Sequence, residues 1–295
     1  MSTLRSPRST VRVLVVGAGG LGCPALWELA PLLAARGGSV TIADDDVVEA
    51  SNLQRQILHR DADVGRPKVD SAADALDRRW PRLAVYTVEA RVAAHNVGAL
   101  VAAHDVVLDG TDSFESKFLL NDACVRAGVP LVHGAVVRFG GQLMTVTSES
   151  ACYRCLFEAP PEPGAAPSCQ EAGVLGAVCG VVGALMAREA LAILDGTPQL
   201  AGALMIYDAL ALPDRARRRV AIRRRLSCEA CARAAAALSA SIARSSTASL
   251  TSASSSTATS PSPSTTTSSS TVASSPASPL PAAGAGRRSS EVPSC

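Results

Sequence analysis

The sequence of 295 residues has few aromatic side chains, little net charge and no long apolar run. Phe, Trp and Tyr make up 3% of it, so Ala, Val and Leu must build most of the core. A formal net charge of +2 argues against a dedicated nucleic-acid-binding protein, because such domains carry a clear basic excess. No run reaches the roughly 18 apolar residues of a membrane span, so none is expected.

A secretory signal is also lacking at the start of the sequence. Residues 1–10 form a short, polar and basic tail that leads directly into a strand-like run. The chain has nine cysteines, and an odd count without an export signal argues against a disulfide framework. We therefore expect a cytoplasmic protein.

The composition changes sharply near residue 240. Between Ser245 and Pro279 the chain is mostly Ser and Thr, with Ala and Pro, and it carries no charged side chain. Such a segment buries too little apolar surface to offset its ordering entropy. We expect residues 236–295 to form a disordered tail and residues 11–235 to form one folded domain.

Within residues 11–235, strand-like and helix-like patterns alternate. Short apolar runs predict buried strands, and apolar residues at helical spacing predict helices between them. The alternation is typical of an α/β fold, here a Rossmann-like, mostly parallel sheet with helices on both faces. Two alternating segments, 141–147 and 219–223, suggest antiparallel strands at the far end of the sheet. The other strands are expected at 11–16, 39–43, 83–88, 106–109 and 130–133, and the helices at 21–35, 67–79, 114–127 and 173–194.

A glycine-rich loop separates the first expected strand from the first expected helix. It reads Gly17-Ala18-Gly19-Gly20-Leu21-Gly22. Bare backbone N–H groups and the positive end of a helix can approach a nucleotide phosphate at such a loop. Asp44 ends the second strand, where a carboxylate can accept ribose hydroxyls. These features predict a nucleotide site, and they fit NAD as well as ATP.

Polar and basic residues after Asp44 distinguish between these two nucleotides. Ser51, Asn52 and Arg55 come shortly after it, and Lys68 begins the next helix. A dinucleotide has one pyrophosphate to neutralise, whereas these groups suit a triphosphate whose leaving pyrophosphate gains charge when the α-phosphorus is attacked. Each basic residue alone could equally belong to a solvated helix face. Their grouping favours ATP over the alternative of an NAD-dependent oxidoreductase.

Two carboxylates follow the strand expected at 106–109. Asp109 and Asp112 belong to a D-G-T-D run, and side chains at this end of a parallel strand face the ligand crevice. Asp112 is placed to hold Mg²⁺, which prefers carboxylate and phosphate oxygens. The alternative is that one of the two acids caps the helix that starts near Phe114.

Four of the cysteines form two C-x-x-C pairs. The pairs are Cys152 with Cys155 and Cys228 with Cys231. Four thiolates favour a tetrahedral structural zinc site with no open position for catalysis, although a single pair could also be redox-active. Cys169 lies alone in a Pro- and Gly-rich loop, where an inert thiol is commoner than a catalytic one. Three more cysteines fall in helical patterns and are expected in the core: Cys23, Cys124 and Cys179.

Together these motifs resemble the MoeB/ThiF/HesA family, whose members are relatives of the ubiquitin-activating enzymes. The resemblance covers residues 11–231 and extends to the adenylation half of molybdopterin-synthase sulfurylase. Its most specific part is the S-N-L-Q-R-Q run with the downstream Lys68. The other matching motifs are G-A-G-G-L-G, D-D-D-V-V-E-A, V-G-R-P-K, D-G-T-D and the paired C-x-x-C.

The resemblance implies an ATP-dependent adenylyltransferase. A small β-grasp sulfur-carrier protein would present its C-terminal Gly-Gly carboxylate, which attacks the ATP α-phosphate to give an acyl-adenylate and pyrophosphate. The route could be molybdopterin biosynthesis, thiamine biosynthesis or another sulfur transfer. The family also implies a homodimer in which an Arg of an N-terminal helix reaches the partner's ATP, whereas only residues 1–10 precede the first strand here.

The same resemblance assigns roles to individual residues. Gly20 would contact phosphate within the loop of Gly17, Gly19 and Gly22, and Asp44 would contact ribose. Asp112 would bind Mg²⁺ with Ser113 beside it, and Cys169 aligns with a cysteine that forms a thioester or persulfide in some members. The residues implied around the triphosphate are Ser51, Asn52, Arg55 and Lys68. The residues implied as zinc ligands are Cys152, Cys155, Cys228 and Cys231.

One further class of function stays open at this point. A degenerate relative could bind the carrier or the nucleotide without turnover. Seven arginines between Arg215 and Arg225 could suggest nucleic acid, but their interleaving with Val220 and Ile222 fits an exposed edge strand or a surface for an acidic carrier. We expect neither nucleic acid nor a membrane as a partner.

Overall fold

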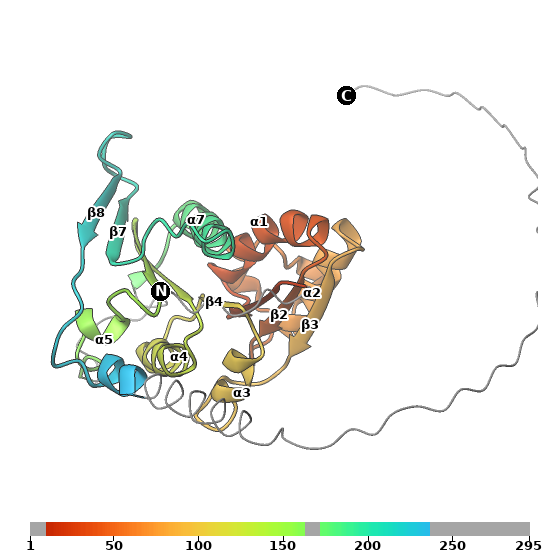
Figure 1. Ribbon diagram of the computed structural model, residues 1–295. Helices are drawn as coiled ribbons and strands as arrows, with labels where there is room; N and C mark the ends of the chain where they lie inside the picture. Colours follow the sequence, from red (N-terminus) through yellow and green to blue (C-terminus); the bar gives the residue numbers. More distant parts are fainter. Residues whose placement is uncertain (1–9, 163–171, 237–295) are drawn as a thin grey trace, which may run out of the picture. The chain divides into compact units, whose positions relative to one another are not determined.

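The computed structural model describes residues 10–162 and 172–236. Residues 1–9, the segment that carries Cys169 and the expected tail beyond residue 236 lie outside the described residues. Within them, eight strands form one sheet in the order β3-β2-β1-β4-β5-β6-β7-β8 (Figure 1). The strands are β1 (Arg12–Val16), β2 (Ser39–Ala43), β3 (Ala84–Val88), β4 (Val106–Asp109), β5 (Leu131–Val137), β6 (Gly140–Val146), β7 (Ala203–Asp208) and β8 (Arg217–Ala221).

The sheet has a parallel half and an antiparallel half. The parallel half consists of β3, β2, β1, β4 and β5. In its register, Val16 of β1 lies opposite Ala43 of β2 on one side and Asp109 of β4 on the other. Strands β5, β6, β7 and β8 pair antiparallel. The chain order reverses between β1 and β4, and ligands of open α/β sheets bind beyond the carboxyl ends of the strands at such a point. The expected fold class, including antiparallel strands at the far end, is confirmed.

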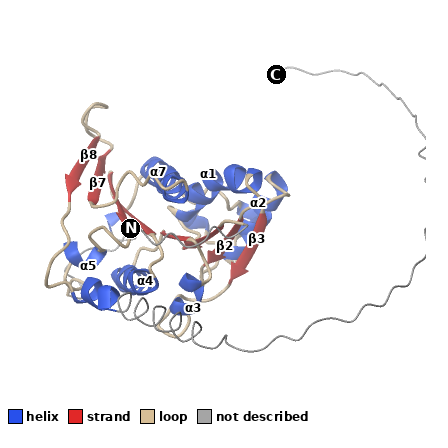
Figure 2. Cartoon of the chain, in the orientation of Figure 1, coloured by secondary structure: helices blue, strands red, loops and turns tan. Residues whose placement is uncertain are grey.

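Helices cover both faces of this sheet, as Figure 2 shows. Helices α1 and α2 share one hydrophobic core with α7, while α3 and α4 share a second core with α5 on the other face. Helices therefore bury β1 and β4 on both faces of the sheet, which explains the continuous apolar runs of these two strands. The helices are α1 (Gly22–Ala35), α2 (Lys68–Arg79), α3 (Val97–Ala102), α4 (Phe114–Ala127), α5 (Tyr153–Leu156) and α7 (Gly176–Leu194).

Helix α7 is long and apolar enough, by length and composition, to cross a membrane. In the described fold it packs on α1 and on the sheet, and its Gly183 has no room for a side chain, because a Cβ there would lie 2.5 Å from Pro24 Cγ. Its Glu189 is buried and accepts a hydrogen bond from Thr145 Oγ1 at 2.9 Å. Gly183 thus allows α7 to pack closely on the start of α1.

Several elements differ from the sequence-based expectation. Strand β7 was not predicted, because its Ala-Leu-Met-Ile run is poor in the β-branched residues that mark strands; its pairing with β6 and β8 forms it. Helix α3 has six residues, too few for a helical period to show. Strand β5 continues to Val137 because its hairpin with β6 extends it, and β8 ends at Ala221 rather than at residue 223.

Candidate functional site

The glycine loop forms a compact turn between β1 and α1. Gly17 has a φ of 92°, a left-handed conformation that a side chain would strain. Its N–H donates to Ala43 O at 2.8 Å, which fixes the loop beside the end of β2. A Cβ on Gly22 would collide with the carbonyl of Gly17, so the first turn of α1 can close only over glycine. The loop therefore presents bare backbone at the start of a helix, as predicted.

Asp44 lies against this loop, as its place after β2 predicts. Its Oδ2 accepts a hydrogen bond from Ala18 N at 2.6 Å, and its Oδ1 accepts one from Asp46 N at 2.9 Å. Burial raises the pKa of the Asp44 carboxyl above its usual value, and the positive charge of Lys68 opposes that shift. Asp44 thus holds the loop in place, and its predicted contact with a ribose stays a prediction.

The two predicted cations reach the loop region from different segments. The Lys68 side chain is 8% exposed, and its Nζ lies 2.7 Å from Asp46 Oδ2. Arg55 donates to Asn52 Oδ1 at 2.8 Å, and its Cδ would lie 3.4 Å from a Cβ on Gly20. The structure therefore brings Arg55 to the glycine loop and Lys68 to the acidic end of β2.

Ser51 and Asn52 lie in the short 3₁₀ turn η1 (Ala50–Asn52) before Arg55. The Ser51 hydroxyl and the Asn52 amide both donate to Glu49 Oε2, each at 3.2 Å. Asn52 is buried, and its carbonyl oxygen holds Arg55. This turn therefore orients the arginine, while the predicted contacts of both residues with a triphosphate stay predictions.

The D-G-T-D turn after β4 packs directly on the glycine loop. Gly110 N donates to Val16 O at 2.9 Å, and a Cβ on Gly17 would lie 2.9 Å from Gly110 O. Asp112 is exposed at the end of this turn. The alternative that an acid caps α4 is wrong, because the cap is Ser113, whose Oγ accepts from Ser116 N at 3.2 Å. Asp112 is thereby left free for a cation.

Asp109, by contrast, does not face a crevice, and the expectation that it does is wrong. It is fully buried. Its Oδ2 lies 3.1 Å from Lys117 Nζ and 2.7 Å from His133 Nδ1. The cation of Lys117 and the hydrogen bond from His133 hold the pKa of the Asp109 carboxyl well below its usual range, against the opposing effect of burial. This cluster was missed because its members are far apart in the sequence.

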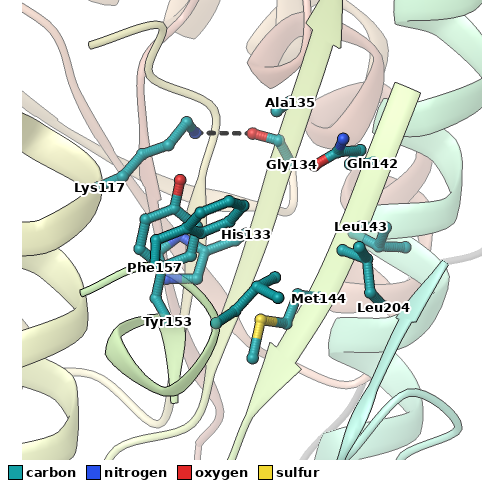
Figure 3. A pocket seen from close by; sticks show the side chains of 11 residues that line it. Lys117, His133, Gly134, Ala135, Gln142, Leu143, Met144, Tyr153, Phe157 and Leu204 are labelled. Carbon is teal, nitrogen blue, oxygen red and sulfur yellow. Dashed lines mark hydrogen bonds between the residues drawn. The ribbon is translucent and has the colours of Figure 1, made fainter. Parts of the chain in front are cut away.

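A small pocket opens beside this cluster, between β5–β7 and the α4–α5 side (Figure 3). Because an ionised carboxylate can only accept, His133 Nδ1 carries the proton given to Asp109, and its buried Nε2 is an acceptor without a partner among the described residues. Burial lowers the pKa of His133, which keeps the ring neutral. The ring of Tyr153 lies 4.7 Å from that of His133 and closes the pocket wall.

His59 is a second residue that sequence reasoning missed. It is buried, its Nε2 lies 2.9 Å from Ala18 O, and its Nδ1 lies 2.8 Å from Ser71 Oγ. Since a carbonyl only accepts, Nε2 carries the proton and Ser71 donates to Nδ1. Burial lowers the pKa of His59, which maintains this neutral form. His59 therefore ties the glycine loop to α2, the helix that begins with Lys68; no periodicity or spacing signalled it.

The four paired cysteines converge at one point, on the α4–α5 side of the sheet. Their sulfur atoms all lie within 4.8 Å of one another, and those of Cys231 and Cys152 are 3.5 Å apart. A tetrahedral zinc with bonds of about 2.3 Å requires sulfur–sulfur distances of about 3.8 Å. All four are free thiols. The donor set and its spacing therefore fit Zn²⁺.

The other cysteines divide into two groups. Cys23, Cys124 and Cys179 are buried, as expected of core residues, and burial raises the pKa of the Cys23 thiol to about 12, which makes it unreactive. Cys169 and Cys295 lie outside the described residues, so the predicted role of Cys169 stays a prediction.

These features define an α/β protein with a glycine-rich loop after its first strand, two cations near that loop, an exposed carboxylate and a cluster of four thiols that could hold a metal. Comparison with known proteins identifies the family within this class. The chain belongs to the ThiF family, which it matches over residues 6–230. The predicted resemblance is thereby confirmed.

Several curated relatives are similar at nearly half of the aligned positions. The SAMP-activating enzyme E1 of Haloferax volcanii is 49% identical over 183 residues, which are 62% of this chain and 67% of that protein. The sulfur carrier protein adenylyltransferase of Thermus thermophilus is 45% identical over 190 residues, or 62% and 69%. The probable adenylyltransferase/sulfurtransferase MoeZ of Mycobacterium tuberculosis is 45% identical over 190 residues, but the chain spans only 48% of it.

Solved structures support the fold. The Escherichia coli MccB structure with ATP matches with a TM-score of 0.64 at 20% identity, covering 76% of this chain and 68% of that one. At this identity the match bears on the fold alone. The relatives named above carry the family assignment.

Proposed function

We propose that this protein is an ATP-dependent adenylyltransferase that activates the C-terminal Gly-Gly carboxylate of a ubiquitin-like sulfur carrier. The observation that supports the proposal is the arrangement of three side chains around the glycine loop. Arg55 lies at the loop, Lys68 lies beside the acidic end of β2 that adjoins it, and Asp112 ends the turn that packs on it. A pyridine dinucleotide would need no such pair of cations beside an acidic turn. The names of the ThiF-family relatives, adenylyltransferase and activating enzyme, point to the same reaction class.

In the proposed reaction, a carrier carboxylate oxygen forms a bond to the ATP α-phosphorus. The bond from this phosphorus to the bridging oxygen breaks, and its electron pair leaves with pyrophosphate. Backbone N–H groups at the glycine loop and the side chains of Arg55 and Lys68 stabilise the charge that gathers on the phosphates. Asp112 would hold Mg²⁺, which supplies further neutralisation of phosphate charge when bound. No protein nucleophile is needed for this step.

The partner and setting are part of the same proposal. A β-grasp carrier of the molybdopterin or thiamine type would dock on this chain, which would act as a homodimer in the cytoplasm. The exposed arginines of β8 offer positive charge to an acidic carrier surface. Zinc at the four cysteines would be structural, since four thiolates leave no open coordination position.

We expect Asp112→Ala to lose most of its ATP–pyrophosphate exchange while it stays folded. The probes are labelled pyrophosphate, ATP, Mg²⁺ and purified β-grasp proteins ending in Gly-Gly, of molybdopterin and thiamine type. Because the Asp112 side chain is exposed and caps no helix, its loss should leave the melting temperature unchanged. Unchanged exchange in the variant would remove Asp112 from the metal role.

The competing function is a degenerate relative that binds nucleotide or carrier without turnover. Calorimetric ATP binding by the wild-type protein, with no exchange for any Gly-Gly carrier in the panel, would support that reading and overturn ours. Carrier-dependent exchange would exclude it. Exchange that requires one carrier type would also assign the pathway.

Cys169 is proposed as the acceptor of the activated carrier. Its thiolate would attack the acyl-adenylate carbonyl and release AMP, giving a thioester. With ATP present, a carrier–enzyme conjugate sensitive to thiol reagents should accumulate, and Cys169→Ala should abolish it yet retain pyrophosphate exchange, because adenylation precedes the thiol step. Cys124→Ala, in which a buried core thiol is removed, is the control that should retain the conjugate. A conjugate that persists in Cys169→Ala would contradict the role.

A further inference from the structure

Asp109 lies at the base of the turn of residues 110–112, which packs on the glycine loop of the candidate ATP site. We propose that Asp109 is the positioning residue that holds this turn and the glycine loop in place. This inference rests on the proposed function. Asp109 does not face ATP, because its carboxylate is fully buried. It acts instead through the turn of residues 110–112, which presents Asp112, and through the glycine loop on which that turn packs.

One carboxylate oxygen of Asp109 fixes the turn itself. Oδ1 accepts two hydrogen bonds from Thr111, one from the backbone N at 3.0 Å and one from Oγ1 at 2.6 Å. Thr111 therefore has both its backbone and its side chain tied to the preceding strand. Because Asp112 follows directly, its direction of departure from the sheet is set by this pair of bonds.

The other carboxylate oxygen anchors the turn to two further elements. Oδ2 accepts from Lys117 Nζ, which lies on α4, at 3.1 Å and from His133 Nδ1, which lies on β5, at 2.7 Å. The same Lys117 ammonium donates to Gly134 O at 2.7 Å, as the dashed line in Figure 3 marks. The carboxylate thus accepts four hydrogen bonds and connects β4, α4 and β5 at the base of the turn.

The turn of residues 110–112 also packs directly against the glycine loop. The backbone of Gly110 and Thr111 touches Gly17 so closely that a Cβ on Gly17 would lie 2.9 Å from Gly110 O and 3.3 Å from Thr111 N. A Cβ on Gly110 would in turn lie 3.2 Å from Gly22 N. The two loops therefore cannot shift independently, and a displaced turn moves both the phosphate loop and Asp112.

The test uses Thr111→Val in the full-length chain, with ATP and Mg²⁺ as probes. This substitution removes the Oγ1 hydrogen bond to Asp109 and keeps the shape of the side chain. We expect the calorimetric Kd for ATP with Mg²⁺ to rise by roughly two- to thirtyfold, the range by which residues without ligand contact change binding through a packed network. The Mg²⁺ concentration that gives half-maximal ATP binding should rise as well, since Asp112 is displaced.

Thr145→Val is the matched control. Thr145 Oγ1 also donates to a buried carboxylate, that of Glu189 at 2.9 Å, but it lies between β6 and α7, away from both loops. Both variants should lower the melting temperature, whereas only Thr111→Val should weaken ATP binding. ATP and Mg²⁺ affinities of Thr111→Val equal to wild type, or an equal loss in Thr145→Val, would overturn the positioning role.

Asp109→Asn provides the larger perturbation. It leaves the Lys117 ammonium buried without its counter-ion, so this variant can fail to fold, in which case Thr111→Val decides the question. If it folds, we expect a weaker ATP affinity than in Thr111→Val, and a wild-type affinity would contradict the inference. Failure of the wild-type protein to bind ATP would instead overturn the proposed function, and this inference with it.

Discussion

Replacing Lys68 by alanine should reduce carrier-dependent ATP–pyrophosphate exchange by about 10²–10³-fold, the usual effect of removing one preorganised group that stabilises transition-state charge. Lys68 is the first residue of α2, and its buried ammonium is held 2.7 Å from Asp46. The proposed reaction gathers negative charge on the leaving pyrophosphate at this end of the site. The loss should therefore appear in kcat as well as in the Kd for ATP.

Removing Lys68 also affects the neighbouring carboxyl. The lysine charge lowers the pKa of Asp44, which burial otherwise raises, so Lys68→Ala should raise the Asp44 pKa further. The exchange activity that remains should then fall at a higher pH on the acid side than in the wild-type protein, because Asp44 protonates earlier. A pH series of exchange rates on both proteins measures this shift.

Arg66→Ala is the control for Lys68→Ala. Arg66 lies two residues earlier and pairs with Asp63 at 2.9 Å and with Asp74 at 2.7 Å, on the outer side of the same segment. Its removal takes away one positive charge from the same region without touching the loop. Exchange should stay near the wild-type rate. Equal losses in the two variants would indicate a general charge effect and refute a specific role for Lys68.

The parallel half of the fold could be predicted because its elements carry local signals. The apolar run of β1 ends in glycines, and helix α4 ends at Gly128, whose φ of 65° suits the left-handed end of a helix. The antiparallel half was harder, since β7 and β8 depend on each other's pairing. The alternation of residues 219–223 predicted β8 but misplaced its ends, because all of its residues are exposed and no buried face fixes its bounds.

The site divides in a similar way. Several site residues could be predicted because each belongs to a motif next to an expected strand or helix. They are Gly17, Asp44, Arg55 and Lys68. His59 and Asp109 could not be given their roles, since these depend on contacts made only in the fold, with Ser71 on α2 and with His133 on β5. The motifs thus predicted the residues around the glycine loop, including Asp44 and Asn52, which hold parts of it in position, but not the long-range contacts of His59 and Asp109.

The cluster of four cysteines predicts a large loss of thermal stability when one of its ligands is removed. Cys228→Ser should remove about one Zn²⁺ per chain and lower the melting temperature by about 8–16 °C. A cross-link that closes a long loop contributes roughly 4 kcal/mol to the free energy of unfolding. Each kcal/mol corresponds to about 2–4 °C in the melting temperature of a domain of this size. The loop runs from Cys155 on α5 to Cys228, and sulfur atoms of the two pairs lie 3.5–3.7 Å apart. Metal content and thermal melting measure both effects.

Cys124→Ala separates the metal from the general cost of changing a buried thiol. Cys124 is fully buried on α4 in the same core as the cluster, but it is not one of the four converging cysteines. It should keep its zinc and lose about 1 kcal/mol, the typical effect of a small core substitution. If Cys228→Ser kept both metal and melting temperature, the cluster would not be a zinc site. If it lost metal but not stability, zinc would bind there without contributing to the stability of the fold.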